Sequence, residues 1–196
     1  MLITKLDIIN ACLECMGEAP VNSFDELHPI ATSAMAALEH CTVAEQAPGW
    51  WYNKETIEII PTTDGEYYIP TDVLSIVADQ NPPWLTQRGS RVYDRRVGQY
   101  FTGTAPLRVS VVRLVDFDDL PYQAKLLVRA ATQKQFQSSF DADETKIQEA
   151  RDAYATAYQL HNSEHIRSVR ANLLYQGATG ERVGRHLWPT YRRGTN

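Results

Sequence analysis

Two histidines four positions apart, His161 and His165, have the spacing in this chain that most resembles a catalytic metal motif. Residues 161–165 read H-N-S-E-H, which fits the H-x-x-E-H pattern of inverted zinc peptidases, where two histidines one helical turn apart share a zinc ion. Such enzymes also need an acidic ligand well downstream. The 31 residues after His165 contain a single acidic residue, Glu181. Histidine pairs on a long exposed helix are more often surface or interface residues, so the pattern is weak evidence for a metallopeptidase.

Three cysteines, Cys12, Cys15 and Cys41, are a second candidate for metal or redox chemistry. Cys12 and Cys15 form a C-x-x-C pair, but the pair falls inside a helical pattern and no second C-x-x-C exists. Buried free cysteine usually behaves as a small apolar residue, which explains the pair more simply than a zinc site does. An odd set of cysteines without a disulfide framework suits a reducing compartment.

Three carboxylates, Asp116, Asp118 and Asp119, could be imagined as the acid and base of a glycoside hydrolase. They precede Pro121, however, at the predicted entry to a helix, where negative charge is favourable without any catalytic role. The chain has no G-x-S-x-G motif and no phosphate-binding loop motif. We therefore predict no catalytic residue, no metal site and no cofactor.

The element that would carry the two histidines is one long helix, predicted over residues 141–176. It begins with the sequence D-A-D-E, a cap with glutamate at its third position, and it is followed by Gly177. Such a helix would span about 53 Å, whereas a globule of this chain length is only about 42 Å across. The distal half should therefore project. Its predicted core face consists of Ile147, Ala150, Tyr154, Ala157, Tyr158 and His161, at spacings of three and four.

Further helices are predicted on both sides of a β region. An apolar stripe over residues 2–16 ends at Gly17, and a second helix runs from Pro29 to about Gln46. A third helix restarts at Pro121, in the position where a missing N–H costs nothing. Its core candidates are Leu126, Leu127, Ala130, Ala131 and Phe140.

Alternating apolar and polar residues between these helices predict short strands. The predicted strands lie near 57–59, 67–69, 74–78, 91–93 and 107–115. We predict an α+β fold in which a helical bundle (1–52 plus 119–176) carries an inserted antiparallel β domain (53–118) and an extended tail (177–196). In residues 107–112 we expect Leu107, Val109 and Val111 on one face and Arg108, Ser110 and Val112 on the other.

Charge is unevenly distributed over the 196 residues, whose net charge is −5. The tail holds four arginines and one glutamate, a balance of +3, which leaves the rest of the chain at −8. An acidic body repels nucleic acid and disfavours a DNA-binding regulator. The chain lacks an 18-residue apolar run and a signal peptide at its start, so we expect it to insert in no membrane and to stay where it is made.

Four short motifs resemble, in order and spacing, the tail tubular protein A family of short-tailed bacteriophages. They lie within residues 8–160, in a chain of matching length. The motifs read L-E-C-M-G-E-A-P-V at 13–21, P-G-W-W-Y-N at 48–53, V-Y-D-R at 92–95 and R-L-V-D-F-D-D-L-P at 113–121.

The resemblance implies a structural virion protein of the phage tail, assembled in the host cytoplasm. Proteins of this family are head-to-tail adaptors that form a ring, taken to be of twelve copies, between the portal protein and the tail nozzle of the tail tubular protein B type. Genomic DNA would pass through the lumen without specific binding. The alternative from another class is a virion-associated hydrolase acting on cell-wall glycan or peptide.

Two interaction regions follow from this interpretation. The long helix and its basic, aromatic tail would dock on the portal, since tryptophan, tyrosine and arginine carry much interface energy. The portal-docking candidates are Arg167, Arg170, Arg182, Arg185, Trp188, Tyr191, Arg192 and Arg193. The candidates for contact with neighbouring subunits or the nozzle are Trp50, Trp51, Tyr93, Asp94 and Arg95. Of the adjacent tryptophans, one should be buried as a domain anchor and the other left for an interface.

Overall fold

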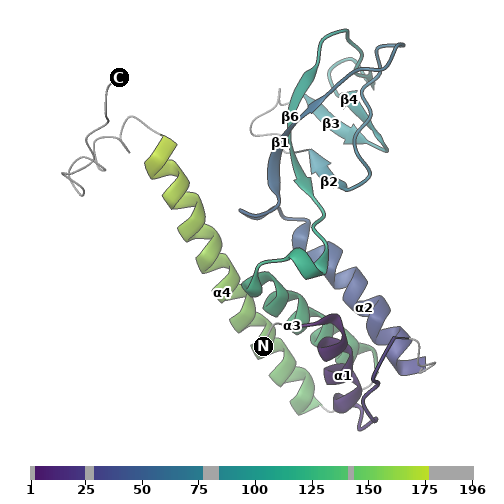
Figure 1. Cartoon of the computed structure of the whole chain (residues 1–196), viewed down its shortest axis with the longest axis vertical. Helices are drawn as coiled ribbons and strands as arrows, with labels where there is room; N and C mark the ends of the chain where they lie inside the picture. The colour runs from purple at the N-terminus through teal and green to yellow at the C-terminus, as the bar shows by residue number, and fades with distance from the viewer. Residues whose placement is uncertain (1–2, 25–28, 77–83, 141–143, 177–196) are drawn as a thin grey trace, which may run out of the picture.

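Segments from both ends of the described chain meet at one end of the molecule, where helices pack together (Figure 1). The computed structural model describes residues 3–24, 29–76, 84–140 and 144–176, with the backbone alone for 171–176. Its helices are α1 (Lys5–Cys15), α2 (Pro29–Gln46), α3 (Tyr122–Ser139) and α4 (Glu144–Gln176). The strands occupy the other end of the molecule, and the predicted α+β fold is confirmed.

The first helix begins and ends at local signals in the sequence. The Thr4 hydroxyl accepts a hydrogen bond from the Asp7 N–H at 3.1 Å, and the Asp7 carboxylate accepts one from the Thr4 N–H at 2.9 Å. This capping box satisfies two N–H groups at the start of α1. At the other end Gly17 adopts a φ of 74°, and the Glu18 N–H donates to the carbonyl of Leu13 at 3.1 Å.

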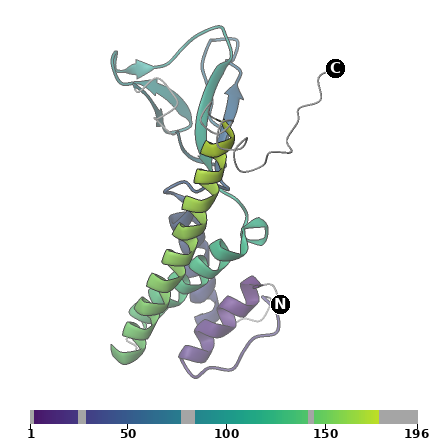
Figure 2. The same cartoon turned by 90° about the vertical axis from the view of Figure 1, so that its left-hand side faces the viewer.

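Helix α3 is the centre of the bundle. It packs against α4 on one side and against α1 and α2 on the other (Figures 1 and 2). Its buried side chains enter three apolar clusters, which join it to all the other helices. The clusters are Ile3, Ile8, Leu38, Phe117, Leu120, Ala124 and Val128; Ile9, Cys12, Leu13, Val21, Ala31, Ala34 and Phe136; and Leu127, Ala130 and Ala157.

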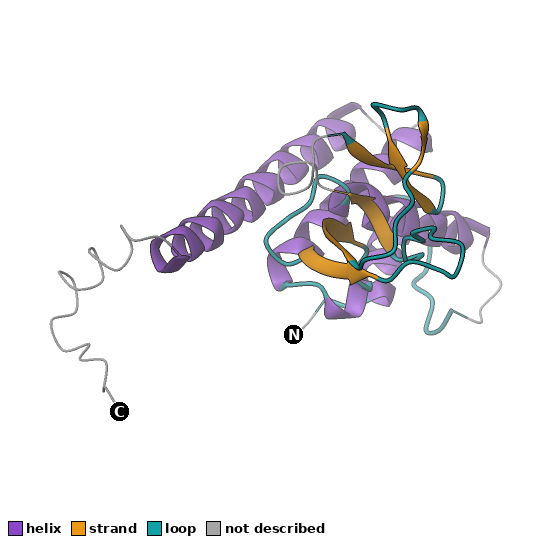
Figure 3. Cartoon of the chain, turned by 90° about the horizontal axis from the view of Figure 1, so that it is seen from above, coloured by secondary structure: helices purple, strands orange, loops and turns teal. Residues whose placement is uncertain are grey.

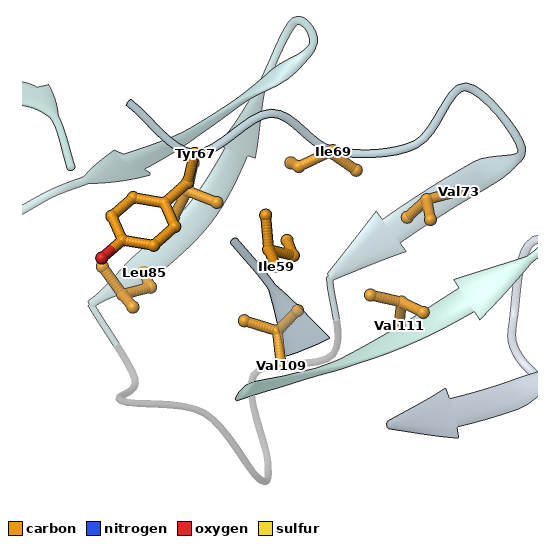
Figure 4. Packing of buried hydrophobic residues seen from close by; sticks show 8 residues of the cluster. Ile59, Tyr67, Ile69, Val73, Leu85, Val109 and Val111 are labelled. Carbon is orange, nitrogen blue, oxygen red and sulfur yellow. The ribbon is translucent and has the colours of Figure 1, made fainter. Parts of the chain in front are cut away.

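The β part consists of two antiparallel sheets around one core. Strands β1 (Lys54–Ile59), β6 (Leu107–Arg113) and β2 (Val73–Ile76) form the first sheet in that order, and β3 (Leu85–Arg88), β4 (Arg91–Asp94) and β5 (Gln99–Tyr100) form the second. Between the sheets lie the buried side chains shown in Figure 4, which come from both sheets and from the segment between β1 and β2. They are Ile59, Tyr67, Ile69, Val73, Leu85, Val92, Val109 and Val111.

Several details differ from the sequence-based expectations. Tyr67 and Ile69 are buried, but their segment makes only isolated bridges rather than a strand. Val112 was expected on the open face of β6 and is 2% exposed, because that face meets the loop of Gly49. Tyr158 was expected in the core of the bundle and is 42% exposed. Strands β3 and β5 were not predicted, since two to four residues carry too short a pattern.

Helix α4 is much longer than the bundle that holds it. Its far end stands apart from the strands in Figure 1 and extends beyond the body of the molecule in Figure 3. The predicted projection is therefore confirmed, but it begins only after His165 rather than at the middle of the helix. The predicted cap at 141–143 and the tail at 177–196 lie outside the described residues.

Candidate functional site

The chain passes twice between the helical end and the β end, and a buried glutamine joins the two passages. Gln46 ends α2, and its side-chain amide donates to the carbonyl of Val115 at 2.9 Å and accepts from the Val115 N–H at 2.9 Å. The same amide also donates to the carbonyl of Thr42 at 3.0 Å. Gln46 is fully buried, so these bonds satisfy an amide that would otherwise destabilise the core.

A second buried amide, Asn53, repeats this arrangement one step along the chain. Its side chain donates to the carbonyls of Gln46 at 3.1 Å and Arg113 at 3.0 Å, and accepts from the Trp50 N–H at 2.7 Å. The backbone of Asn53 also accepts from the Arg113 N–H at 2.9 Å. The outgoing and returning passages are thus tied together by side chains whose polar atoms are paired, and a paired buried network rigidifies its surroundings. We call this the amide clamp.

Gly49 lets the outgoing passage turn within the amide clamp. Its φ is 79°, a conformation that residues with a Cβ rarely adopt. A Cβ at this position would also lie 2.7 Å from Cγ2 of Val112. Position 49 therefore requires glycine both for the turn and for the close approach of β6.

Three consecutive aromatic residues follow the turn, and the helix α4 lies against them. Trp50 is 4% exposed, and its indole N–H donates to the carbonyl of Glu45 at 2.6 Å. Trp51 and Tyr52 are half-buried, with their rings edge to face at 5.1 Å between centroids. Of the two tryptophans Trp50 is therefore the buried anchor, and Trp51 is the more accessible one.

His161 projects from α4 into this group of aromatic rings. Its ring lies 4.3 Å from that of Trp50 and 4.9 Å from that of Trp51, measured between centroids. His161 is fully buried, and neither of its ring nitrogens has a hydrogen-bond partner in the structure. Burial, and then the neighbouring His165, lower the pKa of His161 to about 4. Imidazole is therefore neutral here near pH 7 and acts as a flat packing group.

His165, one turn further along α4, lies beside the same rings. Its centroid is 5.4 Å from that of Trp50 and 6.2 Å from that of Trp51. Burial and the charge of Lys54 lower the pKa of His165. The two histidines of the H-x-x-E-H pattern thus serve the packing of α4, because their rings face indoles. No group of three or more His, Cys, Asp or Glu side chains in the described ranges is placed to hold a metal ion.

A second contact fixes α4 nearer to its start. The Tyr154 hydroxyl donates to the Glu45 carboxylate at 3.1 Å, and the ammonium of Lys134 lies 3.4 Å from the centre of the Tyr154 ring. Burial and then the negative charge of Glu45 raise the pKa of Tyr154 to about 12. Glu45 therefore links both contacts, since its carbonyl holds Trp50 and its carboxylate holds Tyr154.

Beyond His165, every side chain up to Arg170 is exposed except that of Ser168, which is half-buried. Ile166 is 41% exposed and Val169 is 37% exposed. Arg167 and Arg170 are also exposed, and Arg167 pairs with Glu164 at 2.8 Å. These arginines are accessible for docking, as the sequence-based hypothesis requires, but their partner remains a prediction. The other docking candidates, Arg182, Arg185, Trp188, Tyr191, Arg192 and Arg193, lie outside the described residues.

The remaining interface candidates lie at the end of β4. Asp94 is 4% exposed, and its carboxylate accepts from Nη2 of Arg96 at 3.0 Å and from the Arg96 N–H at 2.8 Å. Hydrogen bonding to the Arg96 side chain lowers the pKa of Asp94. Tyr93 is half-buried and packs edge to face on Tyr100, whereas Arg95 is exposed. In this group Asp94 has a structural role inside the chain, and Arg95 offers the more accessible surface.

Among the cysteines and carboxylates considered for chemistry, Cys12, Cys15 and Asp118 are buried in the fold or contact other residues of the chain. Burial raises the pKa of Cys12 to about 12, which keeps it a thiol. The side-chain amide of Gln137 donates to Sγ of Cys15 at 3.2 Å. Asp118, within the short helix η1 (Phe117–Asp119), pairs with Lys5 at 3.8 Å. No helix in the described part of the chain is long and apolar enough to span a bilayer.

Sequence reasoning missed the amide clamp and the partners of the two histidines. A buried glutamine or asparagine has no periodic signature, because its role depends on which backbone groups lie opposite. One signal was available: Asn53 ends the P-G-W-W-Y-N motif and Gln46 ends a helix, both next to the predicted domain boundary. The domain boundaries themselves remain a prediction.

Comparisons with known proteins are consistent with the motifs quoted above. The family model described as "Tail tubular protein" matches residues 6–169. Tail tubular protein A of Klebsiella phage KP34 is 31% identical over 132 residues, which cover 67% of this chain and 70% of that protein. The region matched by the family model contains the amide clamp, the aromatic residues 50–52 and both histidines.

Proposed function

Because the chain belongs to the tail tubular protein family, it is a structural protein of the bacteriophage tail, and we propose that it is the adaptor between portal and nozzle. In this role several copies, twelve by the resemblance, form a ring between the portal protein and a nozzle of the tail tubular protein B type. The ring would surround the channel through which genomic DNA leaves the capsid.

The observation that carries this proposal is the two-ended construction of the molecule. A helical bundle lies at one end, a β core at the other, and buried amides tie both passages between them. An adaptor must present different surfaces to different partners while keeping them at a fixed separation. A molecule with two cores and a clamped junction meets both requirements.

We propose that α4 and the residues after it face the portal. The inner part of α4 is anchored by Trp50 and Glu45, while Arg167 and Arg170 stand exposed on the outer part. The sequence then continues with four more arginines and Trp188. Interfaces are enriched in these residue types.

The charge of the rest of the chain suits a channel wall. Residues 1–176 carry a balance of −8, so they would leave the phosphates of passing DNA with their counterions. We therefore expect no specific DNA binding. The hydrolase alternative is less well supported by the described residues, since His161 is enclosed by aromatic rings and Asp118 pairs with Lys5.

The test is a binding measurement between this protein and the portal protein of the same phage. Deletion of residues 177–196 should strongly reduce portal binding and leave the melting temperature almost unchanged, because the tail has no apolar periodicity. Binding by the full chain should weaken with salt, since exposed charges are screened over about 8 Å at physiological ionic strength.

Two variants of the tail separate its contributions. Trp188→Ala removes apolar contact only, whereas Arg192→Ala with Arg193→Ala should weaken binding and also reduce its salt dependence. A shortened chain that binds the portal with unchanged affinity would refute a docking role for the tail. Docking would then have to be assigned to Arg167 and Arg170 on the helix itself.

A further inference from the structure

A second, largely apolar stripe runs along α4 next to the face that holds the helix to the bundle, and the ring of its member Tyr158 lies 6.1 Å from that of Trp50, between centroids. The buried face is formed by Ala150, Ala157 and His161. The second stripe consists of Ala155, Tyr158, Asn162, Ile166 and Val169, at successive intervals of three, four, four and three residues. Residues at this spacing share one side of a helix. We call this set the outer stripe.

The outer stripe is exposed except at Asn162, which is half-buried. Tyr158, Ile166 and Val169 are 42%, 41% and 37% exposed, and Ala155 is exposed as well. Single exposed apolar residues are normal on a protein surface. A row of them at helical spacing, which continues from the inner part of the helix onto its projecting part, instead marks an interaction surface.

The side of the bundle opposite α4 has complementary charge. Helix α1 lies across α3 from most of α4 (Figures 1 and 2), and only its end at Cys15 meets the start of α4, where Lys146 donates to the Cys15 carbonyl at 3.4 Å. The short helix η1 lies beside α1 through the contact of Lys5 with Asp118. Six carboxylates lie on or next to these segments, and the nearby positive groups include Lys5, Lys125 and Arg129. The carboxylates are those of Asp7, Glu14, Glu18, Asp116, Asp118 and Asp119. Tyr122, 48% exposed at the start of α3, adds apolar surface next to them.

An arginine lies at each end of the outer stripe. Arg151 lies one turn before Ala155 on the same side of the helix, and Arg170 follows Val169. Both arginines are exposed. Apolar residues between two arginines on one side of the molecule therefore match carboxylates beside an exposed tyrosine on the other side. Complementary charge on two different faces is suited to a head-to-tail contact between identical chains.

We propose that the outer stripe binds a second copy of this chain, at the surface formed by α1, η1 and Tyr122. Each copy uses one face toward one neighbour and the opposite face toward the other, so the contact repeats around a ring. The proposal rests on the proposed adaptor function, and it names the surface by which the copies associate. Portal docking is proposed for Arg167, Arg170 and residues 177–196, so Arg170 is shared between the two contacts.

Sedimentation equilibrium of the full chain without portal tests the contact directly. Ile166→Glu with Val169→Glu should raise the dissociation constant for self-association at least about tenfold, because two apolar contacts are replaced by charge. Leu160→Glu is the matched control: Leu160 is 54% exposed on the same helix but lies outside the outer stripe. It should leave self-association unchanged.

A charge exchange tests the orientation of the contact. Arg151→Glu with Arg170→Glu should weaken self-association, and adding Asp118→Lys with Asp119→Lys in the same chain should restore it. Restoration would be specific for a contact between these two surfaces. Failure of the exchange, with the Ile166 and Val169 variant still impaired, would overturn the assignment of the acidic face.

The same variants on the portal separate this inference from the proposed function. We expect the Ile166 and Val169 double variant to bind portal but to form incomplete rings, counted by native mass spectrometry, while the Leu160 variant forms complete rings. Complete rings of the double variant would overturn the inference and leave the adaptor function intact. Failure of the unaltered chain to bind portal would overturn the proposed adaptor function. Absence of self-association both with and without portal would overturn the proposed contact between copies.

Discussion

The inner and outer parts of α4 are one continuous helix with opposite relations to the rest of the molecule. Between Ile147 and His165 the helix contributes a buried or half-buried residue at nearly every turn, on α3 or on the aromatic residues 50–52. From Ile166 to Arg170 only Ser168 is half-buried, and the rest are exposed. The backbone is equally helical in both parts, so helix formation alone does not explain the difference.

This difference separates two tasks of a single element. The inner part stabilises the fold, and the outer part extends beyond it with side chains that are available for contact. A long helix can do this because its hydrogen bonds are satisfied along its own axis, so the exposed turns need no tertiary support beyond the anchored ones. Substitutions in the two parts should therefore differ sharply in their effects on stability.

The largest effect is expected for Trp50→Ala, at the centre of the inner contact. This substitution removes a buried ring that contacts Tyr158, His161 and His165, and it should lower the free energy of unfolding by about 3 to 5 kcal/mol. Thermal or urea unfolding followed by circular dichroism measures the loss. Trp51→Ala, at the half-buried neighbour, should cost clearly less; equal losses would contradict the separate roles of the two rings.

The second-largest effect is expected from acid, which should lower the free energy of unfolding through the inner part of α4. His161 has a pKa near 4 in the folded chain and about 6.5 when unfolded, so the unfolded chain binds the additional proton between these values. Stability should thus be complete above pH 6.5 and fall by about 2 to 3 kcal/mol as the pH decreases to 4.

Urea midpoints from pH 4 to 7.5 test this dependence. His161→Gln should lower stability at pH 7 and flatten its dependence over the same range, because the titrating group is gone. His40→Gln is a matched control, since His40 lies exposed on α2. An unchanged pH dependence in the His161 variant would assign the acid sensitivity to other groups.

Gly49→Ala, in the outgoing passage just before Trp50, should lower the free energy of unfolding by a smaller amount. The positive φ and the close approach to Val112 predict a loss of about 1 to 2 kcal/mol, measured by the same unfolding experiment. Gly89→Ala shares the positive φ but has open space around its Cβ position, so it reports the backbone contribution alone. A loss at Gly49 no larger than at Gly89 would mean that Val112 moves aside at little cost.

The smallest effect is expected in the outer part of α4. Ile166→Glu with Val169→Glu should change the free energy of unfolding by no more than about 0.5 kcal/mol, since exposed substitutions away from structural contacts are usually this mild. Helicity measured by circular dichroism should also persist. Substantial destabilisation would show that the outer stripe supports its own chain, and the comparison between the two parts of α4 would fail.

Sequence periodicity was sufficient for the elements that obey it over several turns. The second helix was predicted to run from Pro29 to about Gln46, which are its observed bounds, and the long helix and its projection were also confirmed. Tyr158 was assigned to the core wrongly, because a three-four spacing admits residues at the edge of a helical face as well as at its centre. Val112 was misplaced for a different reason: the face of β6 opposite the sheet core is covered by a loop distant in sequence.

The site was less accessible to sequence reasoning than the fold. His161 and His165 attracted attention as a metal motif, but their environment is set by aromatic residues more than a hundred positions earlier. The amide clamp depends on Gln46 and Asn53 facing backbone groups near residue 113, a pairing that local propensities do not encode. The family resemblance located the P-G-W-W-Y-N motif, and only the packing explains why glycine, tryptophan and asparagine occur together there.

The amide clamp also determines how the molecule bears load. Two bare passages of chain between two cores would bend like a hinge, and a displacement at one end would be absorbed there. With Gln46 and Asn53 bonded across the passages, bending requires several buried hydrogen bonds to break together. Torque or tension applied to the helical end is therefore transmitted to the strands at the other end, so the junction acts as a stiff coupling.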